Sequence, residues 1–132
     1  MASDPVAAWH ALLATRDIRG LDALLASNVV FHSPVVFKPQ AGKPVTTLYL
    51  GAAMHVFYND TFHYVREVVA NRHAVLEFEV SIDGIIVNGV DMLTWNAEGR
   101  ITDFKVMIRP LKAINLIHQK MAAMLAQHAS QA

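Results

Sequence analysis

A long alternation of apolar and polar residues runs from Ala74 to Arg109, AVLEFEVSIDGIIVNGVDMLTWNAEGRITDFKVMIR. A period of two residues is typical of a strand with one buried and one solvated face. Turn residues interrupt the alternation at Asp83-Gly84 and again between Asn96 and Gly99, and Asp-Gly is a common hairpin turn. With a further turn at Asn71-Arg72, the pattern predicts an antiparallel meander with strands at residues 63–70, 74–81, 85–95 and 101–109.

The segments on either side of this meander have helical spacing. Asp4 followed by Pro5 is typical of an N-cap and a first helical position, and Trp9, Leu12 and Leu13 then recur on one face. We expect Asp17 to cap a second short helix, which carries Leu21, Leu24 and Leu25 and ends at Ser27-Asn28. Pro110 opens a last helix, whose apolar stripe comprises Leu111, Ile114, Ile117, Met121, Met124 and Leu125.

The region between the second helix and the meander is less regular. Residues 29–33 form a short apolar strand, and Pro34 stops it. The segment from Pro34 to Thr47 contains three prolines and a glycine, which indicates a loop or an edge strand because proline cannot donate to a ladder. Residues 51–59 suggest a third helix. Helices, then a meander, then a helix together favour the α+β class.

Asp91 is the anomaly of the meander. The alternation places it on one strand face with Val87, Gly89 and Leu93, so an acid stands among apolar neighbours. On the opposite face we expect Glu77, Glu79, Lys105 and Arg109 to form cross-strand charge pairs, on a surface that is solvated or faces a second subunit.

Composition narrows the function classes. The chain has 132 residues, a length typical of one domain, and we expect a single domain over 1–132. Hydrophobic residues make up 54% and charged residues 17%, which excludes disorder. Net charge is zero with no basic run, so no nucleic-acid partner is expected. There is no cysteine, which excludes disulfides and thiol nucleophiles. No signal peptide or bilayer-length apolar run is evident, so we expect a cytoplasmic protein with no membrane partner.

The order of these features resembles a known family. The segments that carry the likeness are Asp17-Ile18, then Val29-Val30-Phe31-His32-Ser33-Pro34, then a glycine-containing helix, and finally 90–95 followed by 98–101. The sequence is similar to the SnoaL-like and ketosteroid isomerase-like branch of the nuclear transport factor 2-like superfamily. That resemblance implies a cone-shaped, strongly curved antiparallel sheet with N-terminal helices enclosing an apolar pocket. It also implies a homodimer built through the sheet.

The resemblance suggests roles for individual residues. Asp91 matches the acid that the isomerase keeps neutral in an apolar site, so that it can donate a hydrogen bond to an oxyanion. Ser33 stands where the isomerase has its basic aspartate, and Trp9 stands where it has a phenolic donor. An indole donates a hydrogen bond but cannot cycle a proton. The Asp-Arg-Asp cluster of related epoxide hydrolases is not matched beyond Asp91.

His32 is the candidate for the missing base. It adjoins Ser33 and titrates near neutrality, so a dyad of His32 and Asp91 across the pocket is one catalytic hypothesis. The alternative is that strand alternation turns His32 outward while Phe31 and Ser33 face inward. No metal-ligating spacing and no nucleotide-binding motif occur, so neither a metal nor a cofactor is expected.

The predicted function is binding of a small, largely apolar molecule. If the protein is an enzyme, Asp91 acts as acid or oxyanion donor in a cofactor-independent isomerisation, cyclisation or hydrolysis. The alternative is a non-catalytic ligand-binding domain or a dimeric interaction domain. Residues expected to line the pocket are Trp9, Leu13, Phe31, Ser33, Phe57, Tyr58, Phe62, Phe78, Leu93, Phe104 and Val106.

Overall fold

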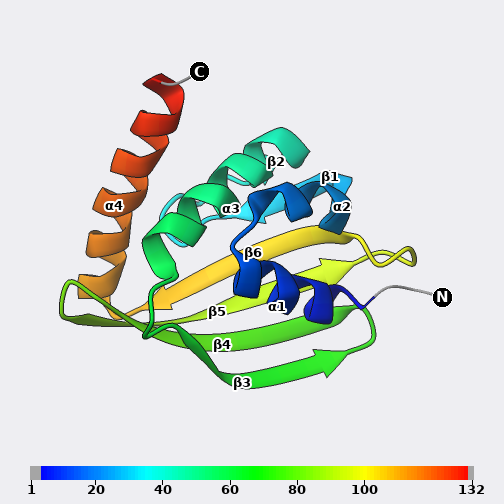
Figure 1. The fold of residues 1–132 in the computed structure, drawn as a ribbon, viewed down its shortest axis with the longest axis horizontal. Coiled ribbons are helices and arrows are strands. Elements are labelled where there is room, and N and C mark those ends of the chain that lie inside the picture. Colours follow the sequence, from blue (N-terminus) through cyan, green and yellow to red (C-terminus); the bar gives the residue numbers. More distant parts are fainter. Residues whose placement is uncertain (1–3, 131–132) are drawn as a thin grey trace.

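Four α-helices, a 3-10 turn and a six-stranded sheet make up the described part of the chain (Figure 1). The structure is a computed structural model that describes residues 4–130, with side chains through residue 127. The elements in order are α1 (Pro5–Thr15), η1 (Ile18–Gly20), α2 (Leu21–Leu24), β1 (Leu25–His32), β2 (Gln40–Ala41), α3 (Lys43–Phe57), β3 (His63–Ala70), β4 (His73–Ile82), β5 (Ile85–Trp95), β6 (Ile101–Arg109) and α4 (Leu111–Ser130).

The meander is confirmed, but the sheet as a whole is mixed. Strands β3 to β6 pair antiparallel with their neighbours in chain order. β1 pairs parallel with β6, so the sheet order is β2-β1-β6-β5-β4-β3. The expectation of an all-antiparallel sheet was therefore wrong at this one junction. Alternation identifies a strand but carries no information about the direction of its neighbour, which here lies about seventy residues away in the chain.

Asp4 caps the first helix as predicted, whereas Asp17 caps the 3-10 turn η1 and not the helix α2 that follows it. The Asp4 side chain accepts hydrogen bonds from the backbone N–H groups of Val6 and Ala7, and Asp17 caps η1 in the same way through Arg19. The expected start of the third helix at residue 51 was wrong, because α3 begins at Lys43 with Pro44 in its first turn. A proline there loses no helical hydrogen bond, so what looked like a loop residue is a helix start.

The irregular segment is consequently shorter than expected. β1 extends back to Leu25, leaving only one turn for α2, and the two-residue strand β2 pairs with β1. The predicted loop of residues 34–47 shrinks to the connection between His32 and α3, interrupted by β2.

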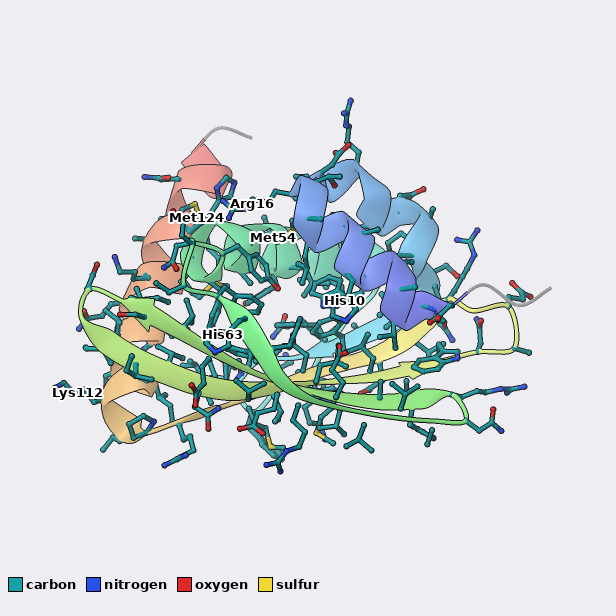
Figure 2. All side chains as sticks on the ribbon, turned by 60° about the horizontal axis from the view of Figure 1, so that its bottom comes forward. His10, Arg16, Met54, His63, Lys112 and Met124 are labelled. Carbon is teal, nitrogen blue, oxygen red and sulfur yellow. The ribbon has the colours of Figure 1, made fainter. Side chains whose placement is uncertain are left out.

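Helices cover only one face of the curved sheet. In Figure 2, α1, α2 and α3 lie above the strands and α4 rises past one end of the sheet, and no described helix covers the side chains that point down from the middle of the sheet. The inner face carries the core, which has two clusters. In one, Trp9 of α1 packs with Leu76 and Phe104 of the sheet. In the other, the strand residues Phe78, Val80 and Val87 pack with Phe57 of α3 and Ile117 of α4. We call the uncovered side the outer face.

The outer face carries the charged residues expected there, but the ion pair found on it joins Glu77 to Arg66 rather than to Lys105 or Arg109. The Arg66 guanidinium lies 3.6 Å from a Glu77 carboxylate oxygen, and the other oxygen of Glu77 accepts a hydrogen bond from Asn88. Arg109 donates to the same Asn88 at 3.2 Å. Apolar side chains stand among these groups, with Val68 56% and Met107 50% exposed.

Candidate functional site

Asp91 lies in the middle of β5 and points to the covered, inner face. Its cross-strand neighbours are Leu76 on β4 and Val106 on β6. Only 5% of the residue is exposed, and it is the one charged residue classed as buried in the part of the chain whose side chains are described. An isolated carboxylate is costly to bury, so its hydrogen bonds and its protonation state decide what the site can do.

A chain of hydrogen bonds connects Asp91 to the first helix. The Tyr64 hydroxyl donates to Asp91 Oδ2 at 2.6 Å, and the Trp9 indole N–H donates to the Tyr64 oxygen at 2.9 Å. The three side chains come from β5, β3 and α1. Trp9 is itself held edge-to-face against Phe104, with ring centroids 5.0 Å apart. The carboxyl group is thereby fixed in position, and one of its oxygens is occupied.

The other oxygen of Asp91 remains for a ligand. Among the side chains that the structure describes, no hydrogen bond to Oδ1 is formed, and Asp91 lines a cavity. Burial raises the pKa of Asp91 to about 7, against a smaller lowering by the hydrogen bond from Tyr64. At neutral pH the carboxyl group is therefore poised between its proton-donating and proton-accepting forms.

The phenols beside Asp91 stay protonated. Burial raises the pKa of Tyr64 far above its ordinary range, and the nearby Asp91 charge raises it further. The same two causes, in the same order, raise the pKa of Tyr58. Both side chains are consequently neutral hydrogen-bond donors rather than bases at physiological pH.

The cavity at Asp91 is small and almost entirely apolar. Its volume is about 30 Å³, which is room for little more than one water molecule. It shares walls with a larger space of about 180 Å³ under α4, which we call the vestibule. The vestibule is comparable to an engineered cavity of about 150 Å³ that binds benzene. The residues lining the inner cavity are Trp9, Phe31, Leu50, Ala53, Phe57, Tyr58, Phe62, Phe78, Asp91, Phe104 and Val106.

Three of the residues expected to line a single pocket lie elsewhere. Ser33 lines the vestibule, where its hydroxyl accepts hydrogen bonds from the backbone of Val35 and Val36. Leu13 lines an open groove between α1 and β3. Leu93 is buried in the core at 1% exposure and lines none of the spaces described here. The other predicted lining residues surround the inner cavity.

The predicted dyad of His32 and Asp91 does not form. The His32 ring lies 2.8 Å from an Asp103 carboxylate oxygen, and both residues face the outer side of the sheet. Phe31, its neighbour on β1, points inward and lines the cavity instead. The hypothesis of a His32–Asp91 dyad is therefore wrong. The physical reason is that neighbouring residues of a strand point to opposite faces, so His32 points outward when Phe31 points inward.

Gly89 shapes the cavity through Phe78, which lies opposite it on β4. A Cβ atom at residue 89 would stand 2.5 Å from Phe78 Cζ and 2.7 Å from the Met107 carbonyl oxygen. Only glycine therefore lets the Phe78 ring lie over β5, where it stacks with Phe62 at a centroid distance of 5.2 Å.

Sequence reasoning missed Tyr64 and the α4 residues of the vestibule. Tyr64 faces inward opposite Phe78, but the register shifts directly after it, between Tyr64 and Arg66. A simple alternation read along β3 is broken by that shift. The only available signal was the aromatic pair Phe62 and Tyr64 at the start of the strand. Ile117, His118 and Met121 line the vestibule from α4.

The described residues contain neither a cluster of metal ligands nor a helix able to span a membrane. Nowhere within residues 4–130 do three or more His, Asp or Glu side chains gather in a way that could hold a metal ion. No helix in that range has both the length and the hydropathy needed to cross a bilayer.

Comparison with known proteins identifies similar sequences and structures. A family model described as SnoaL-like domain matches residues 6–104. A steroid delta-isomerase from Pseudomonas aeruginosa is 37% identical with a TM-score of 0.90, over 96% of this chain and 92% of that one. A bacterial protein with a cystatin-like fold from Silicibacter pomeroyi is 31% identical with a TM-score of 0.83, over 90% and 83%. An NTF2-like protein from Mesorhizobium loti, at 20% identity and a TM-score of 0.70, shares the fold. No curated protein matches.

Proposed function

Because the chain belongs to the family of SnoaL-like domains, we propose that it binds a small, largely apolar carbonyl compound at Asp91 and isomerises it by proton transfer. The observation that carries this proposal is a carboxyl group that is buried among apolar side chains, lines the cavity and has one oxygen bound by Tyr64. An apolar pocket with a few convergent polar groups is the usual form of a small-molecule site.

The neutral form of Asp91 supplies the electrostatic part of the reaction. It donates a hydrogen bond from Oδ1 to the carbonyl oxygen of the ligand, and this bond strengthens as the oxygen gains negative charge in an enol-like transition state. Tyr64 and Trp9 hold the carboxyl group in place, so little reorganisation accompanies the charge development. A donor of this kind is worth about 100-fold or more in rate.

The relative from P. aeruginosa suggests the first substrate to try. That protein is called a steroid delta-isomerase. A shift of a double bond into conjugation with a ketone needs no cofactor, because a water molecule in the cavity can take the proton from one carbon and return a proton to a second carbon. We therefore propose a β,γ-unsaturated cyclic ketone as substrate. Conversion to the conjugated enone is followed by the rise in ultraviolet absorbance.

The decisive comparison is between two Asp-to-Asn variants. Asp91→Asn should lower kcat/KM about 100-fold, because an amide is a weaker donor than a neutral carboxyl group and cannot exchange a proton. Asp103→Asn is the matched control, because Asp103 lies on the outer face beside His32. Equal activity of wild type and Asp91→Asn, with native circular dichroism, would contradict the proposed role.

A passive binding function is the second candidate, and one observation favours it. Asp91 is the one acidic side chain that lines the inner cavity in the described structure, and no histidine joins it there. Ser33 is a poor base, and His32 lies on the other face. Saturable binding of 2-naphthol that depends on Asp91, without turnover of any enolisable ketone, would support this second function.

We also propose a homodimer through the outer face. The face has no helix against it, carries apolar side chains including Val68 and Met107, and contains a hollow of about 190 Å³ near Arg109. Acidic and basic groups lie side by side on it, as in the Glu77 and Arg66 pair. A surface that carries both signs of charge can pair with a copy of itself about a two-fold axis.

A further inference from the structure

A second hollow lies on the opposite side of the aromatic residues that wall the inner cavity. This groove between α1 and β3 has a volume of about 260 Å³. Figure 2 labels three of the side chains that line it, His10, Arg16 and His63, which come from α1, its C-cap and the start of β3. We call this hollow the basic groove.

The basic groove combines one arginine with two histidines. None of its lining residues is acidic. Arg16 is exposed and forms no ion pair or hydrogen bond from its side chain within the described part of the chain. His63 uses Nδ1 on the Thr61 carbonyl, which leaves Nε2 available. Glu67, which is not among the lining residues, binds the His10 ring. A guanidinium without a described partner therefore lines the groove from the α1 side, and the His63 ring lines it from β3.

The basic groove adjoins the site at Asp91. Tyr58 and Phe62 line both the groove and the inner cavity, and Tyr64 lines the groove while its hydroxyl binds Asp91. The rings of Tyr58 and Phe62 pack edge-to-face, with their centroids 4.4 Å apart. Both residues lie in the irregular connection between α3 and β3. Among the described residues, the rings of Tyr58 and Phe62 are thus the side chains common to the groove and the cavity.

The vestibule, which also adjoins the inner cavity, differs from the basic groove in its lining. It shares Phe31, Ala53, Phe57 and Val106 with the inner cavity, and all of these lie on helices or strands. No Lys, Arg, Asp or Glu is found among the described side chains that line it. The lining of the vestibule therefore suits the apolar part of a ligand, whereas the lining of the basic groove suits a charged group at the end of a ligand.

We propose that the basic groove binds the anionic end of the ligand, so that the ligand class is a small aromatic or alicyclic carboxylic acid. Its oxygen-bearing ring end approaches Asp91, and its carboxylate is held by Arg16 with His63 beside it. The rings of Tyr58 and Phe62 part to admit the ligand and then contact its faces. A guanidinium presents a planar fork that matches a carboxylate. This inference rests on the proposed binding function at Asp91 and names the substrate class of that site.

Two probes with the same ring system test the proposal. The hydroxyl group of 2-naphthol imitates an enol at Asp91, and 6-hydroxy-2-naphthoate adds a carboxylate at the far end of the same rings. Affinities are measured by fluorescence titration at low salt. The acid should bind about fivefold more tightly than the naphthol, the size expected for one partly exposed charge pair, and the advantage should shrink in high salt.

Variants at two arginines test whether Arg16 causes the tighter binding of the acid. Arg16→Gln should abolish the preference for the acid and leave naphthol binding unchanged. Arg72→Gln is the matched control, because Arg72 also has a positive φ, 62° against 56° for Arg16, and lies in the turn between β3 and β4. In ¹H–¹⁵N spectra, the acid should shift the signals of Arg16 and His63, whereas naphthol should not.

The outcomes separate this inference from the function on which it rests. Equal binding of both probes, or a preference for the acid that survives Arg16→Gln, overturns the carboxylate site while ligand binding at Asp91 stands. Failure of both probes to bind, or binding that Asp91→Asn leaves unchanged, contradicts the proposed function, and the carboxylate inference falls with it.

Discussion

The carboxyl group of Asp91 makes folding depend on pH. Its pKa in the unfolded chain is near 3.8 and in the folded protein about 7. Between these values the folded state binds more protons than the unfolded state, so the free energy of unfolding decreases as pH rises. Asp91 therefore costs stability at high pH, and the loss is complete above about pH 7.

Asp91→Asn should remove this dependence. The asparagine cannot ionise, and its amide oxygen can still accept the hydrogen bond from Tyr64. The slope is about 1.4 kcal/mol per pH unit, so the variant should gain about 3 kcal/mol over wild type between pH 5 and pH 8. Urea denaturation at the two pH values measures the change. A constant difference between the proteins would show that Asp91 titrates normally.

Gly89→Ala should disturb both the sheet and the cavity. The new methyl group meets the Phe78 ring and the Met107 carbonyl at distances that no relaxed structure has, and the carbonyl belongs to backbone. We expect a loss of about 2 kcal/mol in the free energy of unfolding, as for other overpacked cores. Adding Phe78→Leu to the variant should restore part of the loss. If Gly89→Ala is neutral in urea denaturation, the close approach is not as described.

At the scale of single residues, the sequence was informative about Asp91 and uninformative about its partner. An acid among apolar neighbours at a period of two is unusual enough to be noticed. Tyr64 was not noticed, because a tyrosine is common on either face of a strand and the register shift in β3 hides which way it points. His32 had two possible directions, and strand alternation decides between them only once the strand is known to be regular there.

At the scale of elements, Gly51 lies inside α3 without a packing reason. A Cβ atom there would meet Ile18 side-chain carbons at 3.9 Å, which is ordinary contact. Glycine costs a helix interior about 0.5–1 kcal/mol relative to alanine. Gly51→Ala should raise the free energy of unfolding by that amount, measured in urea. A decrease would mean that α3 must bend or move at this residue.

The meander could be predicted because its strands alternate cleanly and its turns have recognisable residues. The start of α3 could not, because Pro44 has the same identity in a loop as in a first helical turn. The parallel pairing of β1 with β6 was also out of reach, since it depends on the packing of distant segments rather than on any local pattern.

At the scale of the whole molecule, the bare outer face should determine the oligomeric state. Met107→Lys places a charge at the centre of the proposed dimer interface, next to Lys105 and Arg109, and should convert the dimer to a monomer in sedimentation velocity. Leu48→Lys is the control, because Leu48 is 41% exposed on α3, on the covered side of the sheet. A wild-type monomer at micromolar concentration would contradict the interface.

The register shift in β3 has a consequence for comparing this chain with its relatives. Tyr64 binds Asp91 and Glu67 binds His10, so residues three apart on one strand face the same side. That is possible only because Val65 has no partner on β4. A homologue one residue shorter at this place would turn either its counterpart of Tyr64 or its counterpart of Glu67 to the opposite face. The position at which an alignment places the gap is therefore a statement about which of the two contacts, that of Tyr64 or that of Glu67, the homologue keeps.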